Sequence, residues 1–313
     1  MKISGFDQIT GWITGITISG LLCTAFWYYE MSVAGHHQAL DSVRLAETEK
    51  ELLAIAAEKS HSESLKDEAQ QDDQPSTSSL THGAENQTFE GWGYAGNQAP
   101  WYWSTLNDKW QDCGAKTGQS PIDISGSRLD ERLKALKFNY RHGITHLILH
   151  HQTVQGDVDG GSFLDWDGER FDLKRVFFRT PSEHRVNGLP WEMEVQLEHI
   201  AATGKILMVS VLLTPGKATD FLGTFSEHLP RFKDDVKDLE RLNWSELIPA
   251  KKTYWTYTGS STMPPCTPDT RWIILTDTVS TSKNLIDQFV LLQKTNTRPV
   301  FLVGKRELSR SNR

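Results

Sequence analysis

The chain has 313 residues and a formal net charge of −7 at pH 7. The charge is uneven, since residues 1–89 carry 5 Lys+Arg against 13 Asp+Glu, while residues 90–313 carry 28 against 27. This length allows one large domain with a substantial core and additional sequence, and the absence of a basic stripe argues against nucleic acid as a partner.

The first predicted element is a membrane-spanning helix over residues 9–29, which follows a short tail of residues 1–8. This stretch, ITGWITGITISGLLCTAFWYY, contains no charged residue, and as a helix it would span roughly 31 Å, close to the hydrocarbon thickness of a bilayer. A cleaved signal peptide is the competing interpretation, because Ser32-Val33-Ala34 has small residues at suitable spacing. We favour an uncleaved anchor, since the apolar run exceeds the ~7–15 residues of a signal core.

The flanks of this segment indicate an orientation. Lys2 precedes it and an acid-rich stretch follows, which favours a cytoplasmic N-terminus and a domain on the extracytoplasmic side: the periplasm of a bacterium, or the intermembrane space or exterior of a eukaryote. Gly11, Gly15 and Ser19 form a small-residue face that either packs against another membrane helix or reflects glycines tolerated in a lone span. The expected partners are therefore the bilayer, through residues 9–29, and one or more membrane proteins.

Two segments follow the predicted span. Residues 30–58 are predicted to form a helical stalk, with a partial apolar stripe at Leu45, Leu52 and Ile55. The stripe suits either a short coiled coil or a docking helix, and two heptads are too few to decide. Residues 59–88 are polar and low in aromatics, so we predict a disordered acidic linker.

Residues 89–308 carry several motifs, and residues 309–313 are expected to be a tail. The motifs are Trp92-Gly93-Tyr94, Gln119-Ser120-Pro121-Ile122-Asp123-Ile124, Thr180-Pro181-Ser182-Glu183-His184, Tyr257-x-Gly259-Ser260-x-Thr262-x-Pro264-Pro265-Cys266 and Asn296-x-Arg298-Pro299. In this order and spacing the segment resembles the α-class carbonic anhydrases. The resemblance implies a single mainly β (α+β) domain, built on a large, twisted, mostly antiparallel sheet with a conical cavity reaching its centre.

Local patterning agrees with a β-rich fold. Short runs of aliphatic and aromatic residues predict strands at 146–150, 163–166, 206–212, 271–275 and 300–303. Helices are predicted at 233–242 and 282–292, the second with Leu285, Ile286 and Phe289 on one face.

The resemblance also locates the positions at which the family binds zinc through three histidines, and this chain has Phe177, Arg179 and Gln196 there. Catalytic zinc needs three converging lone-pair donors and an open position for water. On a strand, Phe177 and Arg179 would enter the cavity together. A phenyl ring donates no lone pair, a guanidinium repels a dication, and one glutamine is a weak zinc ligand. We therefore expect no metal and no cofactor.

Other positions implied by the resemblance surround this centre. Glu183, Glu194 and Thr262 stand where the family orients the zinc-bound hydroxide and the third histidine. Gln152 replaces a proton-shuttling histidine and cannot titrate near neutrality. Arg179 must be paired if it is buried, so we expect an ion pair with Glu183 or Glu194.

The remaining histidines and the cysteines leave alternatives open. A relocated zinc site is disfavoured, because the adjacent His150 and His151 would face opposite sides of a strand. In secreted members of the family, cysteines at the positions of Cys113 and Cys266 form a disulfide, which requires an oxidising compartment. The alternative is two reduced core cysteines in a cytosolic protein.

Together these features predict a homologue that is not an enzyme. We expect a membrane-anchored, carbonic-anhydrase-like pseudoenzyme that serves as a protein-interaction or structural subunit of a membrane-associated assembly. One alternative is an anion sensor in which Arg179 binds bicarbonate or a carboxylate; another is a carbonate dehydratase with a relocated metal site. Trp191, at the end of a predicted turn, is a candidate contact if exposed, although tryptophans are more often largely buried.

Overall fold

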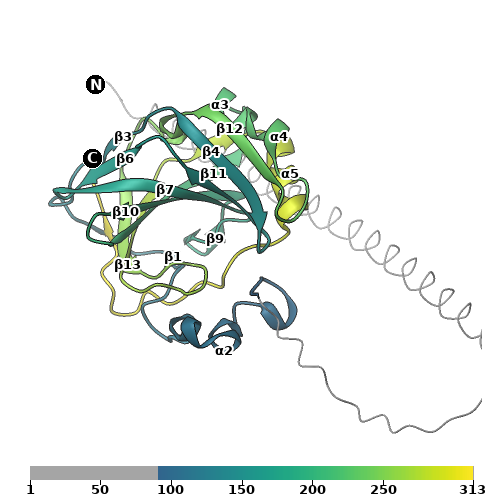
Figure 1. Ribbon diagram of the computed structural model, residues 1–313. Helices are drawn as coiled ribbons and strands as arrows, with labels where there is room; N and C mark the ends of the chain where they lie inside the picture. The colour runs from purple at the N-terminus through teal and green to yellow at the C-terminus, as the bar shows by residue number, and fades with distance from the viewer. Residues whose placement is uncertain (1–90, 313) are drawn as a thin grey trace, which may run out of the picture. The chain divides into compact units, whose positions relative to one another are not determined.

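The computed structural model describes residues 91–312 (Figure 1). Within them, thirteen strands form one mixed sheet. Its main path runs in the order β12 (Val236–Leu242), β4 (Gly143–His150), β5 (Thr153–Val158), β7 (Glu169–Arg179), β10 (Met193–Ala201), β11 (Ile206–Pro215), β14 (Thr270–Leu275), β13 (Tyr254–Gly259), β16 (Ser309–Arg310) and β2 (Arg128–Leu129). Off this path, β15 (Val279–Thr281) pairs with β11, and β6 (Phe163–Trp166) pairs with both β7 and β3 (Lys137–Asn139).

Most neighbouring strands are antiparallel. The exceptions in this sheet are β11, which runs parallel to β14 and β15, and β16, which runs parallel to β2. A second sheet of three short strands contains β1 (Asp123–Ile124), β8 (Arg185–Val186) and β9 (Leu189–Pro190). The structure thus confirms a single domain that is mostly β and is built on a large mixed sheet.

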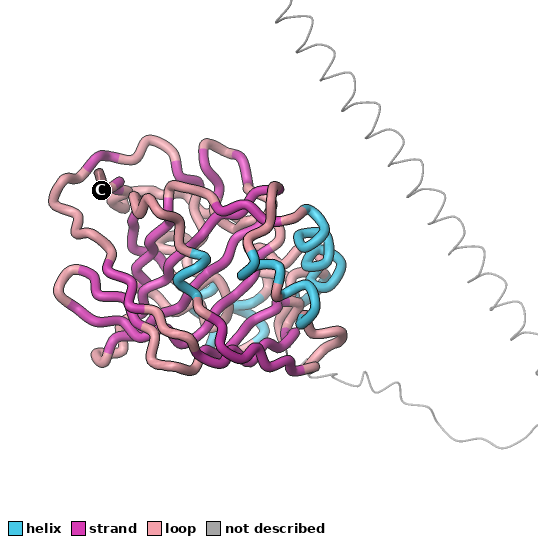
Figure 2. The backbone as a smooth tube through the Cα atoms, turned by 90° about the horizontal axis from the view of Figure 1, so that it is seen from above, coloured by secondary structure: helices cyan, strands magenta, loops and turns pink. Residues whose placement is uncertain are grey.

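Helices make a small part of the described chain, as Figure 2 shows. They are η1 (Gly96–Gln98), α2 (Trp103–Leu106), η2 (Asp108–Gly114), α3 (Asp220–Gly223), α4 (Phe225–His228), η3 (Trp244–Leu247) and α5 (Lys283–Gln293). The longest, α5, begins after Ser282, whose hydroxyl accepts a hydrogen bond from the backbone N–H of Leu285. It buries Leu285, Ile286 and Phe289 on one face.

Two hydrophobic clusters lie on opposite faces of the central strands. The alternation of side chains along β7 places Phe178 in the larger cluster and Phe177 in the second cluster. The second cluster also contains Tyr257 and Trp272. On β10 the residues from Met193 to His199 are all buried, so polar side chains of this strand lie inside the domain.

The predicted elements have mixed outcomes. The strand predictions at 146–150, 163–166, 206–212 and 271–275 are confirmed, as is the helix at 282–292. The helix prediction at 233–242 is wrong, because β12 pairs there with the edge of β4 and Leu239 lies opposite Thr145. Residues 300–303 form an isolated bridge from Phe301 to Ile122 instead of a strand.

The predictions for residues 1–8, 9–29, 30–58 and 59–88 lie outside the described residues. Among residues 91–312, no helix is long and apolar enough to cross a membrane. At the other end of the domain, the segment expected to be a tail begins as strand β16, which adds to the sheet beside β13.

Candidate functional site

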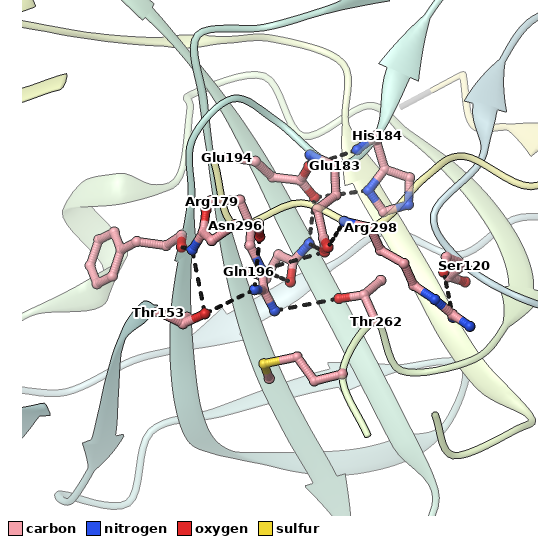
Figure 3. A network of polar contacts seen from close by, with 12 residues as sticks. Ser120, Thr153, Arg179, Glu183, His184, Glu194, Gln196, Thr262, Asn296 and Arg298 are labelled. Atoms are coloured by element: carbon pink, nitrogen blue, oxygen red, sulfur yellow. Dashed lines mark hydrogen bonds and ion pairs between the residues drawn. The ribbon is translucent and has the colours of Figure 1, made fainter. Parts of the chain in front are cut away.

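The paired strands β7 and β10 bring the predicted site residues together. In their register Phe177 lies opposite Gln196 and Arg179 lies opposite Glu194. Side chains at opposed positions point to the same face of a sheet, so all four enter one region. Figure 3 shows Arg179, Glu194 and Gln196 there. Arg179, Gln196 and Glu194 are 0% exposed and Phe177 is 2% exposed. The expected convergence of these residues is therefore observed.

Arg179 lies at the centre of this region, and its guanidinium is surrounded by acceptors. Its Nε donates to Oε1 of Gln196 at 3.3 Å. Its Nη1 donates to the hydroxyl of Tyr94 at 2.6 Å, to the hydroxyl of Thr153 at 3.2 Å and to the carbonyl of Asn296 at 3.3 Å. These partners come from four separate parts of the chain, so the guanidinium ties them together.

Glu183 provides the countercharge. Its Oε2 lies 3.4 Å from Nε of Arg179, and both side chains are 0% exposed. Burial opposes the charge on Arg179, but Glu183 and Tyr94 outweigh it and raise the pKa of the guanidinium. Glu183 also accepts hydrogen bonds from Nε2 of Gln196 at 2.9 Å and from the backbone N–H of Arg298 at 3.0 Å. The expected ion pair is confirmed, with Glu183 as the partner.

The donor set at this centre does not fit zinc. The Oε1 atom of Gln196 accepts from Arg179, and its Nε2 donates to Glu183 and to Glu194 at 2.9 and 3.1 Å, so the amide has partners on both sides. Phe177 contributes a ring, and Arg179 places a buried cation where a dication would need lone pairs. In residues 91–312 no group of three His, Cys, Asp or Glu side chains is arranged to hold a metal ion.

Glu194 contacts the residue at the third predicted zinc position, since its Oε1 accepts from Nε2 of Gln196 at 3.1 Å, whereas the ion pair with Arg179 is made by Glu183. The carboxylate of Glu194 also accepts from the backbone N–H groups of Glu183 and His184, from Nδ1 of His184 at 2.8 Å and from the hydroxyl of Ser210 at 2.7 Å. Burial opposes its charge, but His184 and these hydrogen bonds lower the pKa of Glu194 to about 2. The carboxylate therefore stays ionised and fixes the turn after β7.

The remaining predicted positions lie at the rim of the centre. Thr262 receives a long contact of 3.5 Å from Nη2 of Arg179. Gln152 accepts from the backbone N–H of Tyr94 at 3.1 Å. Burial raises the pKa of Tyr94 to about 12 despite the opposing charge of Arg179, so its hydroxyl stays protonated. The hydrogen bond between Gln152 and Tyr94 therefore joins this rim to the first residues of the described chain.

The cysteine prediction is confirmed. Cys113 and Cys266 form a disulfide across a sequence separation of 153 residues. Arg298 connects it to the site, since its Nη2 donates to the carbonyl of Cys113 and its Nη1 to the carbonyl of Ser120. The disulfide therefore braces the same part of the domain that holds Glu183.

The two adjacent histidines do not lie as expected. His150 ends β4, and the next residue, His151, turns the chain with a φ of 46°. Their rings are 4.0 Å apart instead of facing opposite sides of a strand. Nδ1 of His150 contacts the carboxylate of Asp234, and Nδ1 of His151 contacts the backbone carbonyl of Trp92. Both contacts tie neighbouring loops of the domain together.

Sequence reasoning missed several site residues. Ser210, Thr153 and Asn296 all bond to the centre, and Asn296 had a signal because it opens one of the quoted motifs. Trp191 is half-buried and packs against the second cluster, so it is not a freely exposed contact.

The protein is of the mostly β class, with a buried polar centre where the end of β7 meets the start of β10. Comparison with known proteins gives its family. Residues 98–313 match the family model for eukaryotic-type carbonic anhydrase. A carbonic anhydrase of Nostoc sp. is 30% identical over 215 residues, covering 67% of this chain and 81% of the relative. Dioscorin dioA3 of Dioscorea japonica is 31% identical over 222 residues, covering 64% and 81%. The chain belongs to the carbonic anhydrase family.

Comparison with solved structures supports the same family assignment. A hyperthermostable carbonic anhydrase from an active hydrothermal vent chimney superimposes with a TM-score of 0.68 at 31% identity, covering 71% of this chain and all of that chain. Dioscorin complexed with ascorbate has a TM-score of 0.63 at 28% identity, covering 71% and 98%.

These comparisons contradict the prediction that the chain is not an enzyme. Relatives and structural neighbours at 28–31% identity are named as carbonic anhydrases, so membership of the family points to an enzyme. The prediction inferred a class of protein from the side chains at three positions, which is a weaker basis than similarity over two thirds of the chain. The assignment of Phe177, Arg179 and Gln196 to zinc-binding positions rests on motif resemblance and stays a prediction.

Proposed function

We propose that the protein is a membrane-anchored member of the carbonic anhydrase family whose domain binds a membrane-protein partner. The observation that carries this proposal is an exposed apolar groove between α4 and α5. The groove has a volume of about 370 Å³, and its apolar lining consists of Leu229, Pro230, Leu291 and Leu292. We call these four residues the α5 groove.

The α5 groove suits a partner segment that presents aliphatic side chains. Leu291 is 81% exposed on α5, and exposed apolar side chains that gather at one place mark interaction sites. Glu227 and Arg231 lie beside these four residues in the same lining, so the groove also offers one negative and one positive charge to a partner. The predicted membrane span at residues 9–29 would place the domain beside a bilayer, which makes a membrane protein the expected partner.

The buried centre supports the same proposal. The N–H groups of Arg179 donate to side chains and a carbonyl of this domain. The buried centre therefore stabilises the fold and leaves partner binding to the surface. An anion that bound Arg179 would have to replace Glu183 at a position that is 0% exposed. The geometry therefore favours the interaction role over anion sensing through Arg179.

The test is capture of partners by the full chain from its own membranes, with Leu291→Gln compared with Leu302→Gln. Both leucines are highly exposed, at 81% and 90%, but Leu302 does not line the α5 groove. Burial of one leucine contributes ~1.5–3 kcal/mol, so Leu291→Gln is expected to weaken capture by about tenfold or more. Leu302→Gln should retain the same protein, and an equal loss in both variants would overturn the proposal.

A further variant tests the anchor separately. Replacement of residues 9–29 by an unrelated span should keep the domain at a membrane. If capture persists with the unrelated span but is lost with Leu291→Gln, the α5 groove alone selects the partner. If both changes abolish capture, the small-residue face of the predicted span contributes as well.

Carbonic anhydrase activity is a second candidate function, and the names of the relatives favour it. No zinc-based step follows from the donor set around Arg179, so this candidate rests on family membership. The test is carbon dioxide hydration by the full chain, with and without added zinc. A rate above buffer that falls with Thr262→Ala would support activity at this centre, and a rate equal to buffer would count against it.

A further inference from the structure

A cavity lies at the far end of β7 from the buried centre. Glu169 is the first residue of β7 and Arg179 is the last of its 11 residues, which separates the two places by roughly 33 Å along the strand. The cavity has a volume of about 460 Å³, within the ~300–1,000 Å³ typical of small-molecule sites. It is therefore large enough for a small ligand and distinct from the centre at Arg179.

An aromatic ring with a fixed orientation forms one wall. Trp166 is half-buried at the end of β6, and its Nε1 donates to the hydroxyl of Tyr254 at 3.0 Å. That hydroxyl donates in turn to the carbonyl of Lys134 at 2.7 Å. The polar edge of the indole is therefore bonded, and the guanidinium of Arg271 lies over the ring with Cζ 5.8 Å from its centre. The part of the ring that Arg271 leaves uncovered offers a ligand a flat apolar contact.

Three charged side chains of this cavity make no side-chain hydrogen bond or ion pair within residues 91–312. Arg271 is half-buried and lies with Cζ 5.8 Å from the ring centre of Trp166, yet it makes no hydrogen bond or ion pair there. Asp167 and Asp269 also line the cavity, and their carboxylates have no bonded partner in the described chain. The cavity therefore presents a free guanidinium fork and two free carboxylates beside an aromatic ring.

The mixture of charges limits the class of ligand. The other two charged residues of the lining, Glu169 and Lys205, neutralise each other across 2.8 Å. A small anion attracted to Arg271 would meet two free carboxylates, and a small cation would meet the guanidinium. A neutral molecule with both donors and acceptors around an apolar ring face satisfies all three groups and can lie against the indole. A saccharide has this chemistry.

We propose that this cavity binds a neutral saccharide, with the apolar face of a sugar ring against Trp166. The hydroxyl groups of the sugar donate to Asp167 and Asp269, and its hydroxyl oxygens accept from Arg271. A neighbouring cavity of about 650 Å³ shares Trp166 and Asp167 and continues toward Lys134 and Lys137. The site therefore extends to both sides of the turn at residues 167–168 and favours an oligosaccharide over a single ring.

The experiment is saturation-transfer NMR on the full chain, purified in a detergent that has no sugar headgroup. The probes are glucose, galactose, mannose, N-acetylglucosamine, cellobiose and diacetylchitobiose, with acetate, inorganic phosphate and glucosamine as charged comparisons. We expect transfer to the ring protons of at least one neutral saccharide, and a stronger effect for a disaccharide than for its monomer. Binding of acetate, phosphate or glucosamine in place of every neutral saccharide, or no transfer with any probe, would overturn the proposal.

Variants assign the binding to this cavity. Hydrogen bonds to charged groups contribute ~1.5–3 kcal/mol, so Arg271→Gln and Asp269→Asn should each weaken saccharide binding by about tenfold or more. Asp269 is exposed, so its substitution keeps the test valid if Arg271→Gln impairs folding. The matched controls are Arg170→Gln and Asp159→Asn, which change exposed residues outside both cavities and should leave binding unchanged. Equal binding in Asp269→Asn and the controls would contradict the assignment.

Discussion

Arg179 and Glu183 form an ion pair inside the domain, with Nε and Oε2 3.4 Å apart and both side chains 0% exposed. Neither side chain is exposed to solvent, so each charge depends on the other and on the hydrogen bonds around the pair. Gln196 completes the arrangement because its amide accepts from Arg179 and donates to Glu183. The three side chains act as one unit that joins the end of β7 to β10.

Replacement of Arg179 should therefore be costly. Arg179→Met leaves Glu183 buried without its countercharge, and we expect the free energy of unfolding to fall by ~3–5 kcal/mol. Arg170→Met is the matched control, since Arg170 is exposed on the same strand. It loses only a surface ion pair with Asp172 and a contact with the Phe163 ring, which should cost about 1 kcal/mol. Urea unfolding of the full chain measures both. Equal stabilities of the two variants would contradict the role given to the ion pair.

Removal of both charges should cost less than the two single changes added together. Glu183→Gln combined with Arg179→Met leaves no buried unpaired charge, so we predict a favourable coupling of ~1–3 kcal/mol in a double-mutant cycle. A coupling near zero would mean that Gln196 and the backbone groups satisfy each charge separately.

Stability should fall as the pH drops from about 6.5 toward 4 because of His199. Burial lowers the pKa of His199 to about 4, and its ring contacts the hydroxyl of Tyr140 at 2.7 Å. The unfolded chain takes up a proton near pH 6.5 while the folded chain resists it, so the stabilisation is complete above 6.5 and declines by ~1.4 kcal/mol per pH unit below it. His199→Leu with Tyr140→Phe should remove this slope in urea unfolding measured across that range. An unchanged slope would contradict the assignment to His199.

Glu194 predicts a second loss of stability at lower pH. Its pKa is about 2, against about 4.5 in its ordinary state, so its contribution is complete above 4.5 and is lost as the pH falls toward 2. Glu194→Gln should be less stable than the parent at neutral pH and should show a shallower decline below 4.5. Glu246→Gln, at an exposed position, serves as the control and should keep the parent's profile.

Reduction of the disulfide should destabilise the domain. Cys113 and Cys266 close a loop of 153 residues, and restraint of a loop of this length contributes ~2–5 kcal/mol through the unfolded chain. Cys113→Ala with Cys266→Ala, made with Cys23→Ser so that no thiol remains, should lower the free energy of unfolding by that amount. The stability of this triple variant should not change with reductant, whereas that of the chain with Cys23→Ser alone should fall when reductant is added.

The sequence allowed the fold and part of the centre to be predicted. The spacing of the motifs gave the family, and the burial of Arg179 by strand alternation required a carboxylate, which is Glu183. It did not distinguish Glu183 from Glu194, because the choice depends on the turn that brings His184 onto Glu194. The strand at 236–242 was missed because Leu239 and Leu242 also fit a helical period, and pairing with β4 decided the outcome.

Most partners of Arg179 were beyond sequence reasoning. Tyr94 and Asn296 are 85 and 117 residues away from it along the chain, and no local pattern shows that they meet. The same holds for the saccharide cavity, whose lining comes from the ends of five strands and the turns beside them. The membrane anchor and the α5 groove's partner remain predictions.

A guanidinium, held by Glu183 and Gln196, lies at the place where the family resemblance implies a metal. The most direct test is the zinc content of the full chain after equilibration with zinc and removal of free metal. We predict no stoichiometric zinc that depends on Gln196, because Arg179 fills the site with positive charge. One zinc per chain that is lost on Gln196→Ala would contradict this description of the centre.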